Sequence, residues 1–202
     1  MSPRVVVLDN FDSFTYNLVQ YLAVAGARPT VLRNTAELHE IAARRPTHLV
    51  LSPGPGSVEN PGSYGVCLAA LAHYTGRIPV LGVCLGHQAI GRFYGARTTR
   101  LATVRHGHVS TIRLRRTSRI FAGVPSGFPA MRYHSLAIAA ATLPDDLRLV
   151  ASADDDECVM AVEHARQPVY GVQFHPESIG TPAGQLIIEN FLSVTGSRSD
   201  SG

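Results

Sequence analysis

Cys84 stands at the centre of a Gly-x-Cys-x-Gly pattern that includes Gly82 and Gly86. The apolar run 79–83 before it is typical of a buried strand, and a helix is expected after it. Because glycine has no Cβ, this pattern permits a sharp strand-to-helix turn that lifts the middle residue off the sheet. The unpaired N–H groups of the first helical turn favour a negatively charged sulfur or oxygen. Cys84 is therefore a candidate nucleophile.

A free thiol has a pKa of about 8.5, whereas the thiolate is the nucleophilic form. A helix N-terminus and a neighbouring histidine lower such a pKa into the range of roughly 3.5–7.5. The competing interpretation is structural, because free cysteines are commonly buried beside strands. The five-residue pattern does not separate the two interpretations, so a base and a group that orients it must be found elsewhere in the chain.

His175 is the one histidine of nine that directly follows a strong apolar strand and has a carboxylate at a useful spacing. His175 and Glu177 are two residues apart, so an extended backbone places both side chains on one face. Pro176 stiffens the link and biases His175 toward extended geometry. A histidine held by a carboxylate supplies the base that a cysteine nucleophile requires. We therefore predict Cys84, His175 and Glu177 as the catalytic residues.

The loop 53–56, Pro-Gly-Pro-Gly, follows another expected strand. Proline stiffens such a loop, while glycine exposes the backbone N–H groups, as is expected where the main chain approaches a ligand closely. A plain surface turn is the alternative. In open α/β sheets ligands bind beyond the carboxyl ends of the strands, and two such features at neighbouring strand ends favour a binding site.

The elements that must position these residues alternate between strand and helix in the first half of the chain. Strands are expected at 4–8, 30–33, 48–52 and 79–83, and helices from Asp12 or Ser13 to Ala25, at 37–43 and from Gln88 to Phe93. After Gly95, antiparallel strands are expected within 97–119 and at 147–153, 159–163 and 169–174, followed by a helix at 185–192. The pattern predicts an α/β fold: an open, mainly parallel twisted sheet with helices on both faces plus an antiparallel strand extension. We expect one domain, 1–195, and a disordered tail, 196–202.

Composition and charge argue against several classes of protein. The chain of 202 residues has 45% hydrophobic and 16% charged residues, which is typical of a globular domain rather than a disordered chain. A formal net charge of +3, together with the absence of an 18-residue apolar run, predicts no nucleic-acid partner and no membrane association. The arginine-rich stretch 97–119 lacks aromatic residues, so we interpret it as a solvated sheet edge or partner-facing surface.

Cysteine and histidine spacing bears on location and on metals. Three widely spaced cysteines argue against a disulfide framework and, with no signal-peptide pattern at the N-terminus, predict a cytoplasmic location. Apart from His106-Gly-His108, no pair of Cys or His has zinc-ligand spacing. The run 154–157 lacks the alternating ligands and the glycine of a calcium loop. We predict no metal site.

Several motifs in this chain resemble those of class I glutamine amidotransferases, most closely the glutaminase components of anthranilate synthase and aminodeoxychorismate synthase. They are Asp-Asn-Phe-Asp-Ser-Phe-Thr-Tyr-Asn-Leu (9–18), Leu-Ser-Pro-Gly-Pro-Gly (51–56), Gly-Val-Cys-Leu-Gly-His-Gln-Ala-Ile-Gly (82–91), Arg-Tyr-His-Ser-Leu (132–136), Gly-Val-Gln-Phe-His-Pro-Glu-Ser (171–178) and Ser-Ile-Gly-Thr-Pro (178–182). They occur in family order and cover essentially the whole chain. The resemblance is therefore specific.

The resemblance implies a role for each matching residue. Cys84 would attack the side-chain amide of glutamine and form a γ-glutamyl thioester, while His175, held by Glu177, would move the protons. The backbone N–H groups of Gly56 and Leu85 would form the oxyanion hole. The remaining substrate-binding residues would be Gly54 and Pro55, which shape that loop, and Gln88 with the main chain of Ser135 and Leu136, which hold the α-amino and carboxylate groups. His108 departs from the pattern, because lysine is expected there; this puts in doubt the details of coupling to a partner.

The resemblance also implies a partner, since a chain of this length does not contain a chorismate-converting domain as well. A separate chorismate-using synthase subunit would receive the ammonia, and no cofactor is expected in this chain, because any Mg²⁺ would belong to that subunit. The sequence leaves open whether the product is anthranilate or 4-amino-4-deoxychorismate. Two alternatives also remain: a stand-alone γ-glutamyl hydrolase, and a noncatalytic regulatory or interaction subunit.

Overall fold

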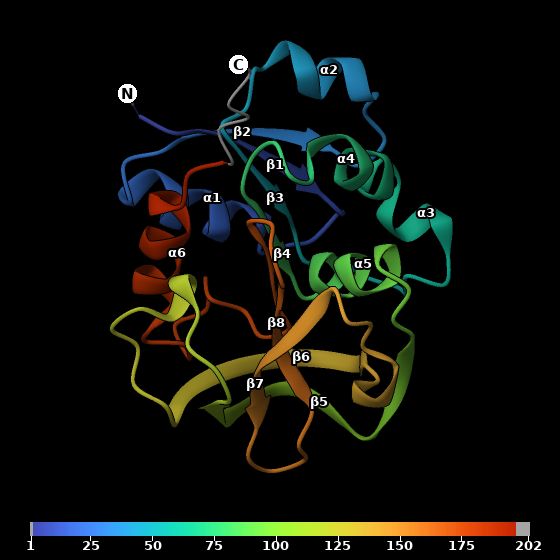
Figure 1. Cartoon of the computed structure of the whole chain (residues 1–202), viewed down its shortest axis with the longest axis vertical. Helices are drawn as coiled ribbons and strands as arrows, with labels where there is room; N and C mark the ends of the chain where they lie inside the picture. The colour runs from blue at the N-terminus through green and yellow to red at the C-terminus, as the bar shows by residue number, and fades with distance from the viewer. Residues whose placement is uncertain (1, 197–202) are drawn as a thin grey trace.

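Nine strands form one sheet within residues 2–196, the part of the chain that the computed structural model describes (Figure 1). In hydrogen-bonded order they are β2 (Arg28–Arg33), β1 (Arg4–Asp9), β3 (His48–Leu51), β4 (Val80–Val83), β9 (Val169–Val172), β8 (Val159–His164), β7 (Leu147–Ala153), β5 (Thr98–Leu114) and β6 (Phe128–Ile138). Neighbours from β2 to β9 pair in parallel, and those from β9 to β6 pair antiparallel. The predicted fold class is confirmed, with an antiparallel extension as large as the parallel part.

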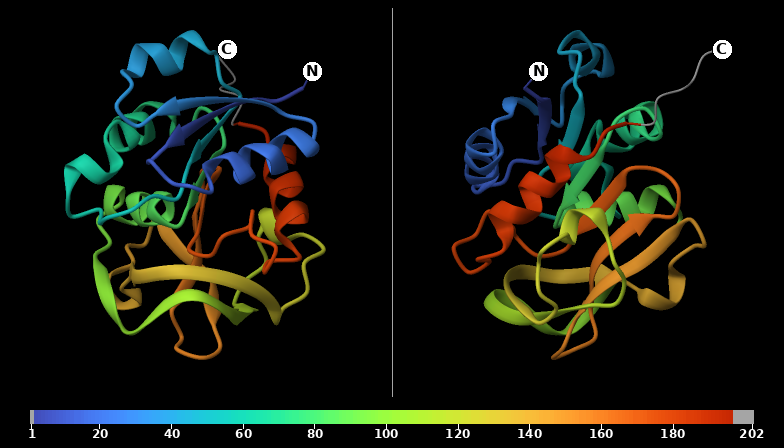
Figure 2. Two further views of the ribbon diagram at one scale, coloured as in Figure 1. Left: turned by 180° about the vertical axis from the view of Figure 1, so that it is seen from behind. Right: turned by 60° about the vertical axis from the view of Figure 1, so that its left-hand side comes forward.

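Helices cover both faces of the parallel half, as predicted (Figure 2). On one face lie α1 (Thr15–Val24) and α6 (Gly184–Ser193), and on the other α2 (Leu38–Ala43), α4 (Cys67–Tyr74) and α5 (Leu85–Phe93). Side chains of β1 alternate between these layers: Val5 and Val7 join the core cluster of α1 and α6, and Val6 and Leu8 that of α4 and α5. Burial on both faces explains why this strand is a continuous apolar run.

Several predicted boundaries need correction. The first helix has Phe14 as its N-cap, not Asp12 or Ser13; the Asp12 carboxylate instead accepts a hydrogen bond from the Phe14 N–H, at 2.8 Å, in the turn before the helix. Gly26, with φ +86°, follows the C-cap as predicted. The helix after Cys84 begins at Leu85, three residues earlier than expected, so Cys84 itself is its N-cap.

The sequence interpretation missed some elements. The two helices α3 (Pro61–Tyr64) and α4 were not predicted, and β6 was recognised only as a motif. Short 3₁₀ turns, η1 (Arg119–Phe121) and η2 (Ala140–Thr142), flank β6. The predicted tail lies outside the described residues except for Gly196, and the domain prediction stays a prediction.

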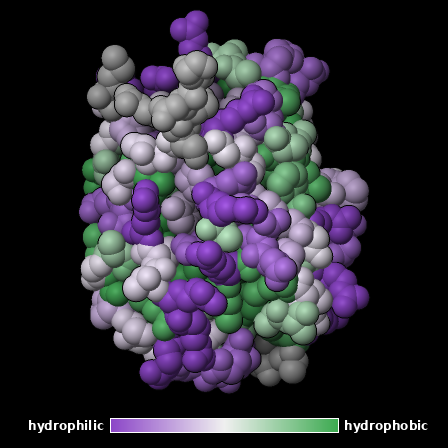
Figure 3. Space-filling view, viewed as in Figure 1, coloured by the Kyte–Doolittle hydropathy of each residue, from purple (hydrophilic) through white to green (hydrophobic). Residues whose placement is uncertain are grey.

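The surface seen in Figure 3 mixes hydrophilic and hydrophobic side chains in small patches. Among the helices of residues 2–196, none has the length and apolar character needed to cross a membrane. The three cysteines, Cys67, Cys84 and Cys158, are all buried.

Candidate active site

Cys84 occupies a strained turn between β4 and α5, with φ 52° and ψ −103°. A side chain at positive φ is costly, so the surrounding structure must hold this residue in place. The Cys84 N–H donates to the carbonyl of Val172 on β9, at 2.9 Å. Both glycines of the pattern are required sterically: a Cβ at Gly82 would overlap the Gly86 carbonyl, and one at Gly86 would overlap the Leu51 carbonyl. The predicted elbow is present.

His175 and Glu177 lie in the segment that follows β9, and their side chains are 3% and 1% exposed. The His175 ring bonds through Nδ1 to the Glu177 carboxylate, at 2.7 Å. The backbone also holds this histidine, because its N–H donates to the Met131 carbonyl, at 3.0 Å, and the Thr181 hydroxyl donates to its carbonyl, at 2.7 Å. The ring edge of His175 meets Tyr133, with centroids 5.0 Å apart. The histidine is therefore fixed in orientation.

The electrostatics of His175 favour an imidazolium. Burial alone would lower the pKa of His175, but hydrogen bonding and attraction to the Cys84 sulfur and to Glu177 raise it well above its ordinary value of 6.5. Among residues 2–196, buried Nε2 has no hydrogen-bond partner at ordinary distance, and the group that acts on this histidine besides Glu177 is the Cys84 sulfur. The site thus pairs the sulfur with a proton donor whose second nitrogen is anchored by a carboxylate.

A cavity of about 160 Å³ opens beside the Cys84 sulfur. This volume is well below the roughly 300–1,000 Å³ of sites for drug-sized ligands, and it suits a ligand the size of an amino acid. All seven residues predicted to bind substrate line this cavity together with Cys84; they are Gly54, Pro55, Gly56, Leu85, Gln88, Ser135 and Leu136. Tyr133 and His134 complete the lining. Sequence reasoning did not predict these two residues, although their position inside the 132–136 motif could have indicated that they line the site.

Asn10 fixes the 53–56 loop from the end of β1 and is 1% exposed. Its N–H donates to the Ser52 hydroxyl and its side-chain amide donates to the Ser52 carbonyl, both at 2.8 Å. A Cβ at Gly54 would lie 2.6 Å from the Asn10 carbonyl oxygen, so only glycine fits there. Gly56 has φ +95°, where glycine is favoured. Sequence reasoning marked the end of this strand but missed this residue.

Gln88 lines the cavity and is held there by two hydrogen bonds. Its Nε2 donates to the Leu136 carbonyl, at 2.8 Å, and to Gln173 Oε1, at 3.1 Å. Gln173 Nε2 in turn lies 3.6 Å from Cys84 Sγ. Sequence reasoning missed Gln173, although it stands two residues before His175 in the same motif.

Among residues 2–196, no group of three His, Cys, Asp or Glu side chains is arranged to hold a metal ion. His108 Nε2 lies 3.4 Å from Asp155, and Arg113 and Arg115 form ion pairs with Asp154 and Glu157 of the β7–β8 turn. Part of the arginine-rich stretch is therefore neutralised within the chain. The predictions of no metal and no cofactor stay predictions.

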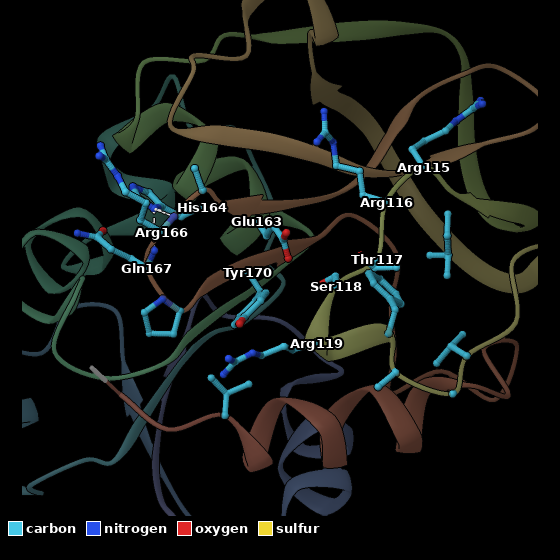
Figure 4. A pocket seen from close by; sticks show the side chains of 18 of the residues that line it. Arg115, Arg116, Thr117, Ser118, Arg119, Glu163, His164, Arg166, Gln167 and Tyr170 are labelled. Atoms are coloured by element: carbon cyan, nitrogen blue, oxygen red, sulfur yellow. Dashed lines mark hydrogen bonds between the residues drawn. The ribbon is translucent and has the colours of Figure 1, made fainter. Parts of the chain in front are cut away.

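A larger cavity, about 1120 Å³, lies apart from the nucleophile and is lined by none of the predicted site residues (Figure 4). Arginines surround it, from the end of β5 (Arg115 and Arg116), from η1 (Arg119) and from the β8–β9 turn (Arg166). It borders the first residues of β9, whereas His175 follows the last. The covalent chemistry therefore belongs to the smaller cavity.

Comparison with known proteins gives consistent matches. The family model "Glutamine amidotransferase class-I" matches residues 6–194. Anthranilate synthase component 2 of Thermus thermophilus is 46% identical over 94% of this chain and 91% of its own length. Aminodeoxychorismate synthase component 2 of Serratia marcescens is 42% identical over 94% and 99%. Another relative is longer, and this chain spans 32% of it.

One solved structure, a putative GMP synthase subunit from Thermoplasma acidophilum, superposes with a TM-score of 0.85 and 27% identity, covering 95% of this chain and 93% of that one. The likeness therefore extends over the antiparallel half of the sheet as well as the parallel half.

Proposed function

The chain belongs to the class I glutamine amidotransferase family, and on that premise we propose that it is a glutaminase subunit that hydrolyses L-glutamine to glutamate and ammonia. The observation that carries the proposal is the juxtaposition of Cys84 with the His175–Glu177 pair at an amino-acid-sized cavity. A cysteine nucleophile, a positioned base and an orienting carboxylate are what acyl transfer from an amide requires.

In the first half-reaction the Cys84 thiolate attacks the amide carbon of glutamine, and negative charge develops on the amide oxygen. The N–H groups of Gly56 and Leu85, which line the cavity, are our candidates for stabilising this charge. The imidazolium of His175 protonates the departing nitrogen, and the C–N bond breaks to release ammonia. The product is a γ-glutamyl thioester and a neutral histidine.

In the second half-reaction neutral His175 accepts a proton from water as the water oxygen attacks the thioester carbonyl. The C–S bond then breaks, which releases glutamate and restores the Cys84 thiolate beside an imidazolium. Glu177 holds the ring through Nδ1 in both steps and stabilises its charge. No metal or cofactor is needed to balance these steps.

Gln88 is our candidate for binding the α-amino group of the substrate. Both of its amide N–H groups are directed to protein acceptors, so its carbonyl oxygen remains as an acceptor for an ammonium group. The main chain of Ser135 and Leu136, which also line the cavity, completes the set proposed to hold the ends of the amino acid.

We further propose that the ammonia passes to a separate chorismate-using synthase subunit. Relatives of 42–46% identity are named component 2 of such synthases, which makes those relatives subunits of assemblies. Exposed apolar side chains near the site support a docking face. Ile179, 97% exposed, lies two residues after Glu177, and Phe14, 40% exposed, stacks on Tyr133. Both synthase names occur at similar identity, so we propose anthranilate or 4-amino-4-deoxychorismate as the product of the assembly. A cytoplasmic location stays a prediction.

The test is to incubate the purified chain with glutamine, alone and with each candidate synthase plus chorismate and Mg²⁺, and to measure glutamate, ammonia and the aminated product. A subunit of the proposed kind yields aminated product only with its synthase. Hydrolysis of γ-glutamyl peptides by the chain alone would identify a γ-glutamyl hydrolase. Absence of glutamate in every mixture, while the synthase still uses added ammonia, would identify a noncatalytic subunit.

A further inference from the structure

Arg132 is fully buried and begins a chain of hydrogen bonds that ends at the nucleophilic sulfur. Its guanidinium lies against the carboxylates of Asp155 and Asp156, at 3.2 and 2.9 Å, and donates to the Ser110 hydroxyl, at 3.0 Å. Its Nε–H points the other way, to His134 Nε2, at 3.1 Å. A buried guanidinium without such partners would be very costly, so this arrangement holds Arg132 in one orientation.

The chemistry of Arg132 decides the tautomer of His134. A guanidinium has five N–H donors and no acceptor, so His134 Nε2 must accept. Burial and the Arg132 charge lower the pKa of His134 to about 4, which keeps the ring neutral at physiological pH. The ring proton is therefore on Nδ1 and is donated to the Leu136 carbonyl, at 2.9 Å. The orientation of the Leu136 peptide therefore depends on Arg132, which does not line the cavity.

The Leu136 carbonyl decides the next two orientations, because a carbonyl can only accept. The Gln88 atom at 2.8 Å from it must be the amide nitrogen, and the second N–H of that nitrogen reaches Gln173 at 3.1 Å. The Gln173 atom that receives this bond must be Oε1, which turns the Gln173 amide nitrogen toward Cys84 Sγ, at 3.6 Å. Arg132 can only donate and the Leu136 carbonyl can only accept. These two groups therefore determine the direction of every hydrogen bond between Arg132 and Cys84.

We propose that Gln173 is a further catalytic residue, which donates an N–H hydrogen bond to the sulfur of Cys84 and stabilises the thiolate, and that Arg132 and His134 are positioning residues for it. The catalytic meaning rests on the proposed glutaminase function, whereas the hydrogen bond itself can be tested without glutamine. Gln173 is suited to the role because it is 0% exposed and its backbone N–H is anchored to the Met160 carbonyl, at 2.9 Å.

The hydrogen bond from Gln173 stabilises the Cys84 sulfur most when the sulfur is negatively charged. A hydrogen bond to a thiolate is stronger than one to a neutral thiol or thioester sulfur. Gln173 therefore increases the fraction of thiolate before attack and stabilises the thiolate that leaves when water breaks the thioester. His175 interacts with the same sulfur and exchanges protons, whereas a carboxamide does not ionise.

The direct test is the pH dependence of Cys84 alkylation by iodoacetamide in the isolated chain, with the labelled site identified by mass spectrometry. Replacing Gln173 by Leu removes the donor, and we expect the midpoint of the alkylation profile to rise by about one pH unit, because a hydrogen bond to a charged group changes ionisation about tenfold. The nearly isosteric Gln173→Glu places a carboxylate there and should raise the midpoint at least as far.

Other titratable groups near the sulfur are retained in these variants. They are His175 and Glu177 after β9, His134 on β6, His87 on α5, and Asp12 before α1, which interacts with His175 and Glu177. Gln167→Leu, in the β8–β9 turn beside the larger cavity, is the matched control and should keep the wild-type midpoint. Wild-type midpoints in folded Gln173→Leu and Gln173→Glu would overturn the proposal.

His134 tests the positioning part. His134→Leu removes the donor to the Leu136 carbonyl and should raise the midpoint, whereas His134→Asn keeps a donor near the position of Nδ1 and should restore most of the wild-type value. Equal midpoints for the two variants would overturn the role of His134. If the chain failed to hydrolyse glutamine but these midpoints moved as expected, only the proposed function would be lost.

Discussion

The backbone N–H of Cys84 donates to the carbonyl of Val172, at 2.9 Å. This bond extends the parallel pairing of β4 with β9 by one residue, into the turn that carries the nucleophile. The same strand β9 leads directly into the segment that carries His175 and Glu177. Nucleophile and base therefore meet because two strands far apart in the sequence are neighbours in the sheet.

Replacing Cys84 by Ser should abolish glutamine-dependent product formation by the complex and leave ammonia-dependent formation unchanged, because ammonia enters downstream of the thiol chemistry. The assay measures aminated chorismate product with either nitrogen source. Cys158→Ser, at a buried cysteine outside the cavity, is the control and should retain both activities. Equal loss with both nitrogen sources in Cys84→Ser would contradict the division of labour between the subunits.

His175→Ala should reduce glutamine turnover by about 10²–10⁴, the usual contribution of a general acid–base residue. Glu177→Gln should reduce it less, because a group that orients the base matters less than the base itself. Steady-state kcat with saturating partner is the quantity to compare. A wild-type rate for His175→Ala would exclude this histidine as the base.

His87 should make the protein sensitive to acid. It is fully buried, and burial with the nearby His134 lowers the pKa of His87 to about 3. Between its ordinary value of 6.5 and about 3, the unfolded chain binds a proton that the folded chain does not, so stability falls as pH falls. In His87→Leu the dependence of the unfolding free energy on pH should flatten in this window, whatever its absolute value.

Unfolding by urea at a series of pH values provides the measurement. If the unfolding free energy of wild type and of His87→Leu depended on pH in the same way, the pKa of His87 would not be lowered by folding.

Gly86→Ala should destabilise the fold by about 1–3 kcal/mol or prevent folding, because the added Cβ would overlap the Leu51 carbonyl. Gly26→Ala is the comparison, since its φ of +86° is unfavourable for alanine but no atom lies within 4 Å of the added Cβ. We expect the larger loss in Gly86→Ala by chemical unfolding. If Gly26→Ala cost more, steric overlap at the elbow would not be the main reason that glycine is required there.

The isolated chain should be a poor glutaminase that its partner activates. Gly56 permits rotation of a peptide in the 53–56 loop, and an oxyanion donor must lie about 2.7–3.1 Å from the developing charge. Partner contact near Asp9–Ser13 would select the competent loop conformation, because Asn10 joins that segment to Ser52. Thioester formation, trapped on Cys84 with labelled glutamine, should accelerate when partner is added. Equal rates in the free chain and the complex would exclude this gating.

The sequence alone allowed prediction of the features that depend on residues close together in the chain. The Gly82–Cys84–Gly86 pattern specifies its own turn, Gly26 ends its own helix, and the two-residue spacing of His175 and Glu177 places them together. The alternation of strands and helices determined the fold class for the same reason, since apolar periodicity is a local property. The residues expected to bind substrate came from family resemblance and not from a derivation of the cavity; they line one cavity, and their role in binding stays a prediction.

Only the tertiary structure decided which strands pair and what lies between them. The residues of apolar strands such as β3, β4 and β9 do not specify which strand each one pairs with. The position of β9 beside β4 therefore follows from packing of the whole sheet. The contact of Gln173 with Cys84 exists because β9 lies beside β4, and the ion pairs of buried Arg132 exist because β6 and the β7–β8 turn are brought together. Side-chain hydrogen bonds between distant segments depend on positions that only the folded chain defines.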